Sequence, residues 1–134
     1  MKDNNRSDCP ISSGLDVWGD KWTLVIVRDL LFFDKNTYGE FLKSREKIAT
    51  NILASRLLAL EENGIIIKSK HPESKAKILY QLTDKGIELL PMMVESAIWG
   101  ENNLCISEEI KTILKEVKKD KAGYIKNRIK ELKA

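Results

Sequence analysis

Histidine and cysteine are scarce in this sequence, and their scarcity excludes several chemistries. A single histidine, His71, cannot form a His-based metal site or a catalytic dyad within one chain. The two cysteines, Cys9 and Cys105, are too few for a disulfide scaffold and match no zinc-binding spacing. A C-x-x-C motif and a Gly-rich phosphate loop are also lacking. We therefore expect no metal, no cofactor and no enzymatic activity.

Long hydrophobic runs are absent as well. No apolar stretch approaches the roughly 18 residues that a membrane span requires, and the polar N-terminus carries no signal-peptide core. The content of hydrophobic residues, 43%, and of charged residues, 32%, is typical of a soluble globular protein. We expect a cytoplasmic protein that does not bind membranes.

Positive charge is concentrated in the middle of the chain. Residues 43–77 hold eight Lys/Arg against four Asp/Glu, which gives +4, whereas the whole chain carries only +3. Such a local surplus attracts phosphates. A solvated charged face is the more common origin of such a run, so the charge alone does not establish a nucleic-acid partner.

The first half of the chain predicts four helices. Ser12 or Ser13 is expected to cap the first, which runs to Val17, and Asp20 to cap the second, over 21–33. The remaining two helices are indicated by a capping box and by a leucine stripe. Thr37 and Glu40 form the T-x-x-E box, and the stripe places the fourth helix over 50–63.

The second half predicts a hairpin and a helical tail. Strands over 65–70 and 78–82 are joined by a polar loop, 71–77. A long amphipathic helix follows from residue 84 to at least 99, with a kink expected at Pro91. A charged helical tail starts at Ser107 and is divided near Gly123. The fold class is mainly α (α+β): a winged helix-turn-helix with an N-terminal helix and C-terminal dimerisation helices.

Several short motifs resemble those of the HxlR-type regulators, relatives of the MarR-like winged-helix proteins. In order they are Cys9-Pro10, Gly19-Asp-Lys-Trp22, IATNILASRLLALEENG over 48–64, YQLTDKG over 80–86, Leu89-Leu-Pro91 and Trp99-Gly100. The resemblance implies a homodimer that binds operator DNA, with the 50–63 helix in the major groove and the hairpin beside it. It predicts a DNA-binding domain with dimerisation helices over 1–104 and an extension over 105–134. Ala49, where the family usually has a small hydroxyl cap, and the long charged tail depart from the family pattern.

The exposed N-terminal half of the 50–63 helix is the predicted base-reading surface. Thr50, Asn51 and Ser55 are short and polar, and Asn51 can bond bidentately to adenine. The alternative for Thr50 and Asn51 is a capping role. Arg56 lies nearer the inner stripe and fits an ion pair as well as a phosphate contact.

Two cationic groups flank that helix. Lys43, Arg45 and Lys47 precede it, where phosphates are expected. The predicted wing carries Lys68, Lys70, His71, Lys75 and Lys77. Lysines that protect an exposed hairpin edge are the alternative.

Apolar side chains on two helices predict a dimer interface. They are Ile11, Leu15, Trp18, Met92, Met93, Ile98 and Trp99. The alternative is that this surface folds back on its own domain. Cys9, beside Arg6 and ahead of the first helix, is a candidate redox or electrophile sensor. The resemblance supports that role, while packing as a small hydrophobe is the alternative.

The predicted function is a sequence-specific transcriptional regulator, in the form of a repressor on an inverted-repeat operator. Its partners would be double-stranded DNA, a second copy of the chain, and a small-molecule or oxidant effector. A winged-helix protein-interaction module without DNA binding is the alternative. A thiol enzyme built on Cys9 is disfavoured because no base lies near that residue in the sequence.

Overall fold

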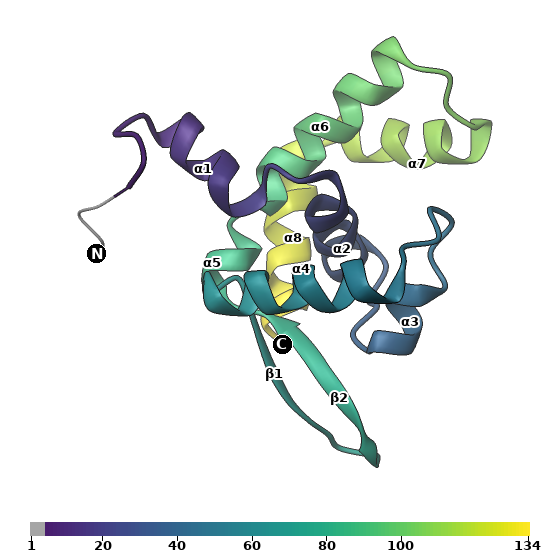
Figure 1. Ribbon diagram of the computed structural model, residues 1–134. Helices are drawn as coiled ribbons and strands as arrows, with labels where there is room; N and C mark the ends of the chain where they lie inside the picture. Colours follow the sequence, from purple (N-terminus) through teal and green to yellow (C-terminus); the bar gives the residue numbers. More distant parts are fainter. Residues whose placement is uncertain (1–4) are drawn as a thin grey trace. The chain divides into compact units, whose positions relative to one another are not determined.

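The computed structural model describes residues 5–134 and divides at Thr83/Asp84 into two compact units. The first unit contains α1 (Pro10–Trp18), α2 (Lys21–Phe32), α3 (Tyr38–Leu42), α4 (Thr50–Glu62), β1 (Ile66–His71) and β2 (Ser74–Leu82) (Figure 1). The second contains α5 (Asp84–Ile87), α6 (Leu90–Asn103), α7 (Glu108–Lys119) and α8 (Lys121–Lys133). The predicted mainly helical fold with one antiparallel hairpin is confirmed. The division by packing lies before the predicted boundary at residue 104, which remains a prediction about function.

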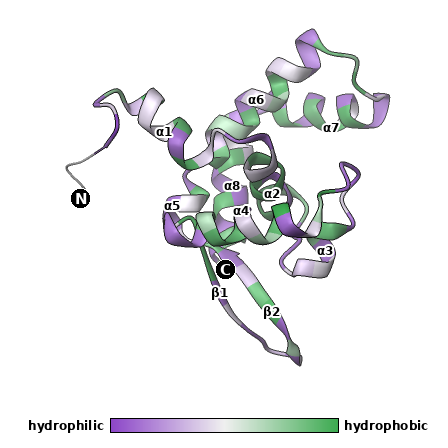
Figure 2. Ribbon diagram, in the orientation of Figure 1, coloured by the Kyte–Doolittle hydropathy of each residue, from purple (hydrophilic) through white to green (hydrophobic). Residues whose placement is uncertain are grey.

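The core of the first unit lies between α2, α4 and the base of the hairpin. Leu53, Leu57 and Leu60 are all buried on one side of α4, as their i, i+4, i+7 spacing predicts. They are covered by the hydrophobic side of α2 and by the start of β1. Figure 2 shows that α2 is mainly hydrophobic, whereas the far end of the hairpin is mainly hydrophilic. This packing leaves the opposite side of α4 exposed.

The hairpin is longer than predicted. β2 begins at Ser74 rather than at residue 78, and His71 pairs with Ser74 across the turn. Antiparallel pairing continues to the turn because the proline of the segment, Pro72, falls in the turn itself and not in a strand. On its other edge, β2 is joined to the α2–α3 connection, where the Tyr80 amide donates to the Asn36 carbonyl at 2.8 Å.

The first helix begins earlier than predicted. Cys9, rather than Ser12 or Ser13, is its N-cap, and its Sγ accepts from the Ser12 amide at 3.5 Å. Pro10 occupies the first helical position, where a missing amide hydrogen has no cost and the fixed φ suits the helix.

The predicted long helix after the hairpin is two helices, α5 and α6. Pro91 lies in the first turn of α6, so one helix ends before the proline and a second begins there, in place of a single kinked helix. A proline in the first turn loses no intrahelical hydrogen bond, whereas one in the interior does. The tail likewise divides at Asp120, not Gly123, because the Asp120 carboxylate accepts from the Gly123 amide at 3.1 Å and caps α8.

The second unit is a small helical cluster with its own buried residues. Leu90 and Val94 of α6 are buried, as are Leu114 and Val117 of α7. Ion pairs connect these helices at their surface: Lys118 with Glu101 at 2.6 Å, and Lys121 with Glu95. No helix within residues 5–134 has both the length and the hydropathy to cross a bilayer.

Candidate nucleic-acid interface

Helix α4 presents its N-terminal polar residues to solvent. Thr50, Asn51 and Ser55 are all exposed. The N-cap is Ala49, and no side chain caps the helix. The capping alternative for Thr50 and Asn51 is therefore wrong. Both residues lie within the helix, and neither side chain forms a capping hydrogen bond. The Tyr38 hydroxyl donates to the Thr50 carbonyl at 2.8 Å and fixes the first turn of α4 to α3.

Arg56 forms an ion pair instead of pointing outward as a free DNA contact. Its Nε donates to Asp20 Oδ2 at 2.8 Å and its Nη2 to Asp20 Oδ1 at 3.3 Å. The same carboxylate caps α2 by accepting from the Thr23 amide at 2.9 Å. The hydrogen bond from Arg56 is the main cause that lowers the pKa of Asp20 to about 2. Of the two roles predicted for Arg56, the structure shows the ion pair, which ties the start of α2 to the middle of α4.

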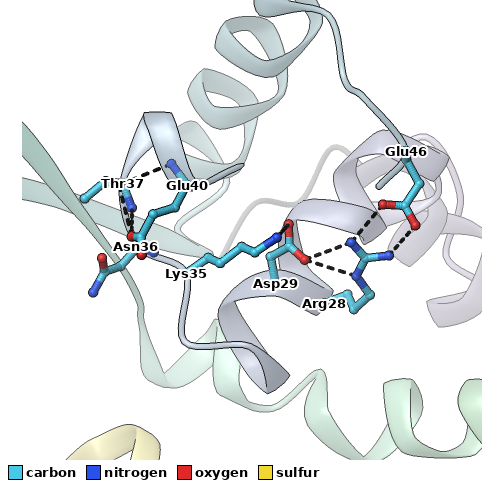
Figure 3. Close-up of polar contacts among 7 residues, drawn as sticks. All are labelled: Arg28, Asp29, Lys35, Asn36, Thr37, Glu40 and Glu46. Carbon is cyan, nitrogen blue, oxygen red and sulfur yellow. Dashed lines mark hydrogen bonds and ion pairs between the residues drawn. The ribbon is translucent and has the colours of Figure 1, made fainter. Parts of the chain in front are cut away.

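A polar network holds the loop that precedes α4 (Figure 3). Arg28 on α2 donates to both oxygens of Glu46, at 2.6 and 3.0 Å, and to Asp29 Oδ1 at 2.8 Å. Asp29 is only 1% exposed, and its other oxygen lies 3.8 Å from Lys35 Nζ. We call Arg28, Asp29, Lys35 and Glu46 the α2 brace. The α2 brace ties the 43–49 loop to α2 through the bonds from Arg28 to Glu46.

The loop held by the α2 brace displays three cations. Lys43, Arg45 and Lys47 are exposed, and within the described residues none of them forms an ion pair. Lys47 has a φ of 56°, so the chain makes a sharp turn two residues before the N-cap of α4. The predicted cations thus precede α4 with their charges available to a phosphate.

The predicted capping box of α3 is confirmed. Thr37 Oγ1 accepts from the Glu40 amide at 3.4 Å, and Glu40 Oε1 accepts from the Thr37 amide at 3.1 Å. The same oxygen accepts from the Asn36 amide at 3.1 Å (Figure 3). These bonds, that of Asn36 first, lower the pKa of Glu40. The box sets where α3 begins and so where Tyr38 meets α4.

The hairpin carries the predicted wing cations at its surface. Lys68, Lys70, Lys75 and Lys77 are exposed. Lys68 Nζ lies 3.7 Å from Glu61 Oε1, whereas the other three form no ion pair within the described part of the chain. His71 is half-buried, and its Nδ1 accepts from the Glu73 amide at 3.1 Å, so it contributes to the turn.

The candidate dimer residues belong to α1 and α6, and the candidate sensor Cys9 directly precedes α1. On α1, Ile11 is 72% exposed and Leu15 is 50% exposed, whereas Trp18 is half-buried. On α6, Trp99 is 62% exposed, and Met92, Met93 and Ile98 are half-buried. Cys9 and Cys105 are both exposed free thiols. Arg6, near Cys9 in the sequence, donates to Asp16 at 3.0 Å and to Ser12.

Sequence reasoning missed the α2 brace and the role of Tyr38. Arg28 and Asp29 stand out as a charged pair inside an apolar helix, and that contrast is the signal that could have found the brace. Its partner Glu46 lies 18 residues away and gives no sequence signal. Within residues 5–134, no three metal-binding side chains come together to form a metal site.

A helix-turn-helix followed by a two-stranded wing defines a winged helix-turn-helix protein, and comparison with known proteins gives its class as transcriptional regulator. The family model described as HxlR-like helix-turn-helix matches residues 17–109. The chain belongs to the HxlR family of helix-turn-helix regulators.

Three relatives illustrate the similarity. An HTH-type transcriptional regulator of Halalkalibacterium halodurans is 32% identical, over 76% of this chain and 90% of the relative. The crystal structure of PA1607, a candidate transcription factor, matches with a TM-score of 0.69 and 40% identity. The match covers 78% of this chain and 71% of that one. The redox regulator HypR in its oxidised form has a TM-score of 0.64 at 29% identity, covering 73% of this chain and all of that one (100%).

Proposed function

We propose that this regulator binds duplex DNA sequence-specifically as a homodimer and represses transcription from an inverted-repeat operator. The observation that carries the proposal is the exposed polar N-terminal half of α4, flanked by unpaired cations. Thr50, Asn51 and Ser55 have short side chains that let a helix approach base edges closely. Asn51 reads an adenine in the major groove through its amide.

Phosphate contacts supply the remainder of the affinity. Lys43, Arg45 and Lys47 meet the backbone before α4, and the wing lysines meet it beyond the helix. Each phosphate neutralised releases counterions, so DNA affinity falls as salt rises. Protection of an exposed hairpin edge does not require the separate cations of the 43–47 loop, which favours the DNA-binding interpretation.

The dimer is proposed from exposed apolar side chains on α1 and α6. Ile11 and Leu15 on α1 and Trp99 on α6 are each at least half exposed, and large exposed apolar side chains favour a protein contact. A two-fold dimer would separate two recognition helices by about 34–36 Å, one turn of DNA, or by a multiple of it.

Footprinting of the intergenic region beside the gene tests the proposal. A protected inverted repeat, bound by a species that sediments as a dimer, is the expected result. The variant Lys70→Ala/Lys75→Ala should reduce the slope of log affinity against log salt by up to about 2. No protected site and no salt-dependent binding would contradict the proposal and favour a protein-interaction module.

A redox response through Cys9 is proposed as the form of regulation. Cys9 is an exposed thiol at the N-cap of α1, beside the exposed apolar residues of the proposed interface. HypR, of similar fold, is described as a redox regulator and is known in oxidised and reduced forms. Oxidation of Cys9 would link or reorient the subunits and so change the spacing of the two recognition helices.

A further inference from the structure

Helix α8 concentrates positive charge within the second compact unit. Its residues, Lys121–Lys133, include five Lys/Arg and one Glu, which gives +4. By contrast α6 of the same unit has two Glu and no Lys or Arg, which gives −2. Helix α8 also lies beyond residue 109, where the family match ends, so the shared family pattern does not account for its charge.

The lysines of α8 lie on the side that faces solvent. Helix α8 packs against α5, α6 and α7. Its packed side is formed by half-buried side chains: Tyr124, Ile125, Arg128, Ile129 and Leu132. Lys126, Lys130 and Lys133 are exposed and follow one another at i, i+4 and i+7, which places them on one side of a helix. We call these three residues the α8 lysine stripe.

The charges of the stripe are available to a partner outside the chain. Acidic residues of α6 pair with lysines of α7 and of the first turn of α8. Lys126 and Lys130, however, form no ion pair within residues 5–134. Lys133 Nζ lies 3.9 Å from Asp84 Oδ1, and the Asp84 side chain is 86% exposed. An ion pair so exposed is weak, so it does not withdraw Lys133 from the stripe.

We propose that the α8 lysine stripe binds the phosphates of duplex DNA and adds to the contacts of α4 and the wing, an inference that rests on the proposed function. The stripe extends over about 10 Å along the helix axis. A row of cations of that length matches a polymer with regularly spaced anions, and duplex DNA carries one negative charge per about 1.7 Å. Lysine binds a phosphate as a point charge and requires no fixed orientation.

Two other polyanionic partners fit the helix less well. A helix that binds a membrane surface exposes a large apolar side next to its cations, whereas the apolar side of α8 is packed against its neighbours. A protein partner is held mainly by aromatic or aliphatic anchors at the centre of the contact. The exposed side of α8 carries no aromatic or large aliphatic residue.

Phosphate contacts carry no information about base sequence. The stripe should therefore raise the affinity for operator and random duplexes alike and make both more sensitive to salt. This differs from the role proposed for Asn51, which concerns the operator alone.

Gel shifts with the full chain over a range of salt concentrations test the stripe. Lys126→Ala/Lys130→Ala should weaken binding to operator and random duplexes by about three- to thirtyfold at low salt. It should also reduce the slope of log affinity against log salt by up to about 2 per chain. Far-ultraviolet circular dichroism checks that the helices of the variant are intact.

The matched control is Lys111→Ala/Lys119→Ala. These two exposed lysines of α7 each pair with a Glu of their own helix, at 3.5 and 3.0 Å. The control removes the same charge from the same unit and should leave affinity and salt slope near those of the wild type. Equal losses in the two variants would show an effect of net charge and would overturn the stripe.

Lysine acetylation by acetic anhydride, followed by mass spectrometry, tests the contact directly in the wild type. Duplex DNA should protect Lys126 and Lys130 and leave Lys111 and Lys119 as reactive as in the free protein. If operator DNA is bound while Lys126 and Lys130 stay fully reactive, the stripe is refuted and the proposed function stands.

The remaining outcomes separate the two proposals. Binding that depends on Lys126 and Lys130 but shows no operator preference would support the stripe and contradict the sequence-specific function. A wild type that binds no duplex would refute both. Binding to phosphatidylserine vesicles that is as tight as binding to DNA, and equally weakened in Lys126→Ala/Lys130→Ala, would show a general polyanion surface and overturn the assignment to DNA.

Discussion

At the scale of single residues, the interface separates side chains that position α4 from side chains available to DNA. Arg56 and Tyr38 have protein partners, and Ser55 Oγ accepts from Arg56 Nη1 at 3.3 Å, whereas Asn51 is exposed without a partner in the described part of the chain. A residue engaged in a hydrogen-bonded pair must break it before it can contact DNA, and that cost opposes the new contact. Sequence specificity is therefore expected to depend on the exposed residues.

Asn51→Ala should weaken binding to operator DNA by about 1–3 kcal/mol, because one bidentate base contact is lost. Binding to random DNA should change little, since phosphates supply that affinity. Competition gel shifts with operator and scrambled duplexes measure both. Asn127→Ala, which removes an exposed asparagine on α8, is the matched control for a loss of polarity. An unchanged operator preference in Asn51→Ala would show that another residue reads the base.

Asp20→Asn separates the ion pair with Arg56 from the capping of α2, because asparagine still caps a helix. The pKa of Asp20 falls from 3.8 to about 2 on folding, chiefly through the Arg56 hydrogen bond. The stabilisation is therefore fully present above pH 3.8 and is lost as the pH falls through about 2.

Urea unfolding of wild type and Asp20→Asn should show the wild type more stable at neutral pH, with the difference disappearing toward pH 2. Asp20→Ala should cost about 1 kcal/mol more than Asp20→Asn at neutral pH, since it also removes the cap. A difference between wild type and Asp20→Asn that is independent of pH would contradict the assignment.

At the scale of secondary-structure elements, the α2 brace joins the second helix to the loop before the recognition helix. Two of its contacts differ in burial: Asp29 is 1% exposed, while Glu46 is 38% exposed. Buried and exposed pairs contribute differently to stability, because only a buried charge left alone keeps its full desolvation cost. The α2 brace can therefore be tested both at its buried pair, Arg28–Asp29, and at its exposed pair, Arg28–Glu46.

Arg28→Met should lower the free energy of unfolding by about 1–3 kcal/mol, because the buried Asp29 carboxylate loses its main partner. Among the described residues, Lys35 at 3.8 Å is then its one remaining ion-pair partner. Glu46→Gln breaks only the outer pair and should cost less than about 1 kcal/mol. Urea unfolding of the two variants measures the difference. Equal losses would show that the exposed end of the brace matters as much as the buried end.

Much of this arrangement was predictable from local sequence, and the remainder depends on contacts distant in sequence. The Thr37–Glu40 capping box, the Asp20 cap and the buried Leu53–Leu57–Leu60 stripe were all correct because each is decided within one or two helical turns. Glu46, the distant partner of Arg28, lies 18 residues away, and Asp20, the partner of Arg56, lies 36 residues away; neither could be chosen from the sequence.

Local rules also failed where two of them competed. The apolar pattern continues across Pro91 and places it in a helix interior, but proline is tolerated in the first turn and a new helix begins there. The sequence pattern starts β2 too late because the first residues of the strand, Ser74 to Lys77, are polar or small and lack the pattern of a strand. Pairing with β1 decides their conformation instead.

At the scale of the whole molecule, the proposed dimer would couple a change in one chain to the DNA contacts of both chains. In the proposed dimer each copy would contribute one recognition helix, and an inverted-repeat operator requires two at a fixed spacing. An event at the proposed dimer interface therefore changes the DNA affinity of both copies together. Cys9 lies on the element that begins this interface, next to the exposed Ile11.

Oxidation by diamide should change the operator affinity of the wild-type dimer and should leave Cys9→Ser unaffected. Serine is a suitable replacement because it can take over the N-cap role that Cys9 has in α1, so the variant loses the thiol but keeps the helix start. Cys105→Ser is the matched control, since Cys105 is the other exposed thiol. Gel shifts before and after diamide, with reversal by dithiothreitol, measure the response, and non-reducing electrophoresis shows whether subunits are cross-linked.

The two cysteine variants decide among three arrangements of thiols. A response lost in Cys9→Ser and kept in Cys105→Ser indicates a bond between the Cys9 residues of two subunits. Loss in both variants indicates a Cys9–Cys105 bond, because a disulfide needs both thiols. If wild type and Cys9→Ser respond equally, Cys9 is not the sensor and serves only as the cap of α1. A response shared by wild type and Cys9→Ser but lost in Cys105→Ser would assign the oxidised thiol to Cys105.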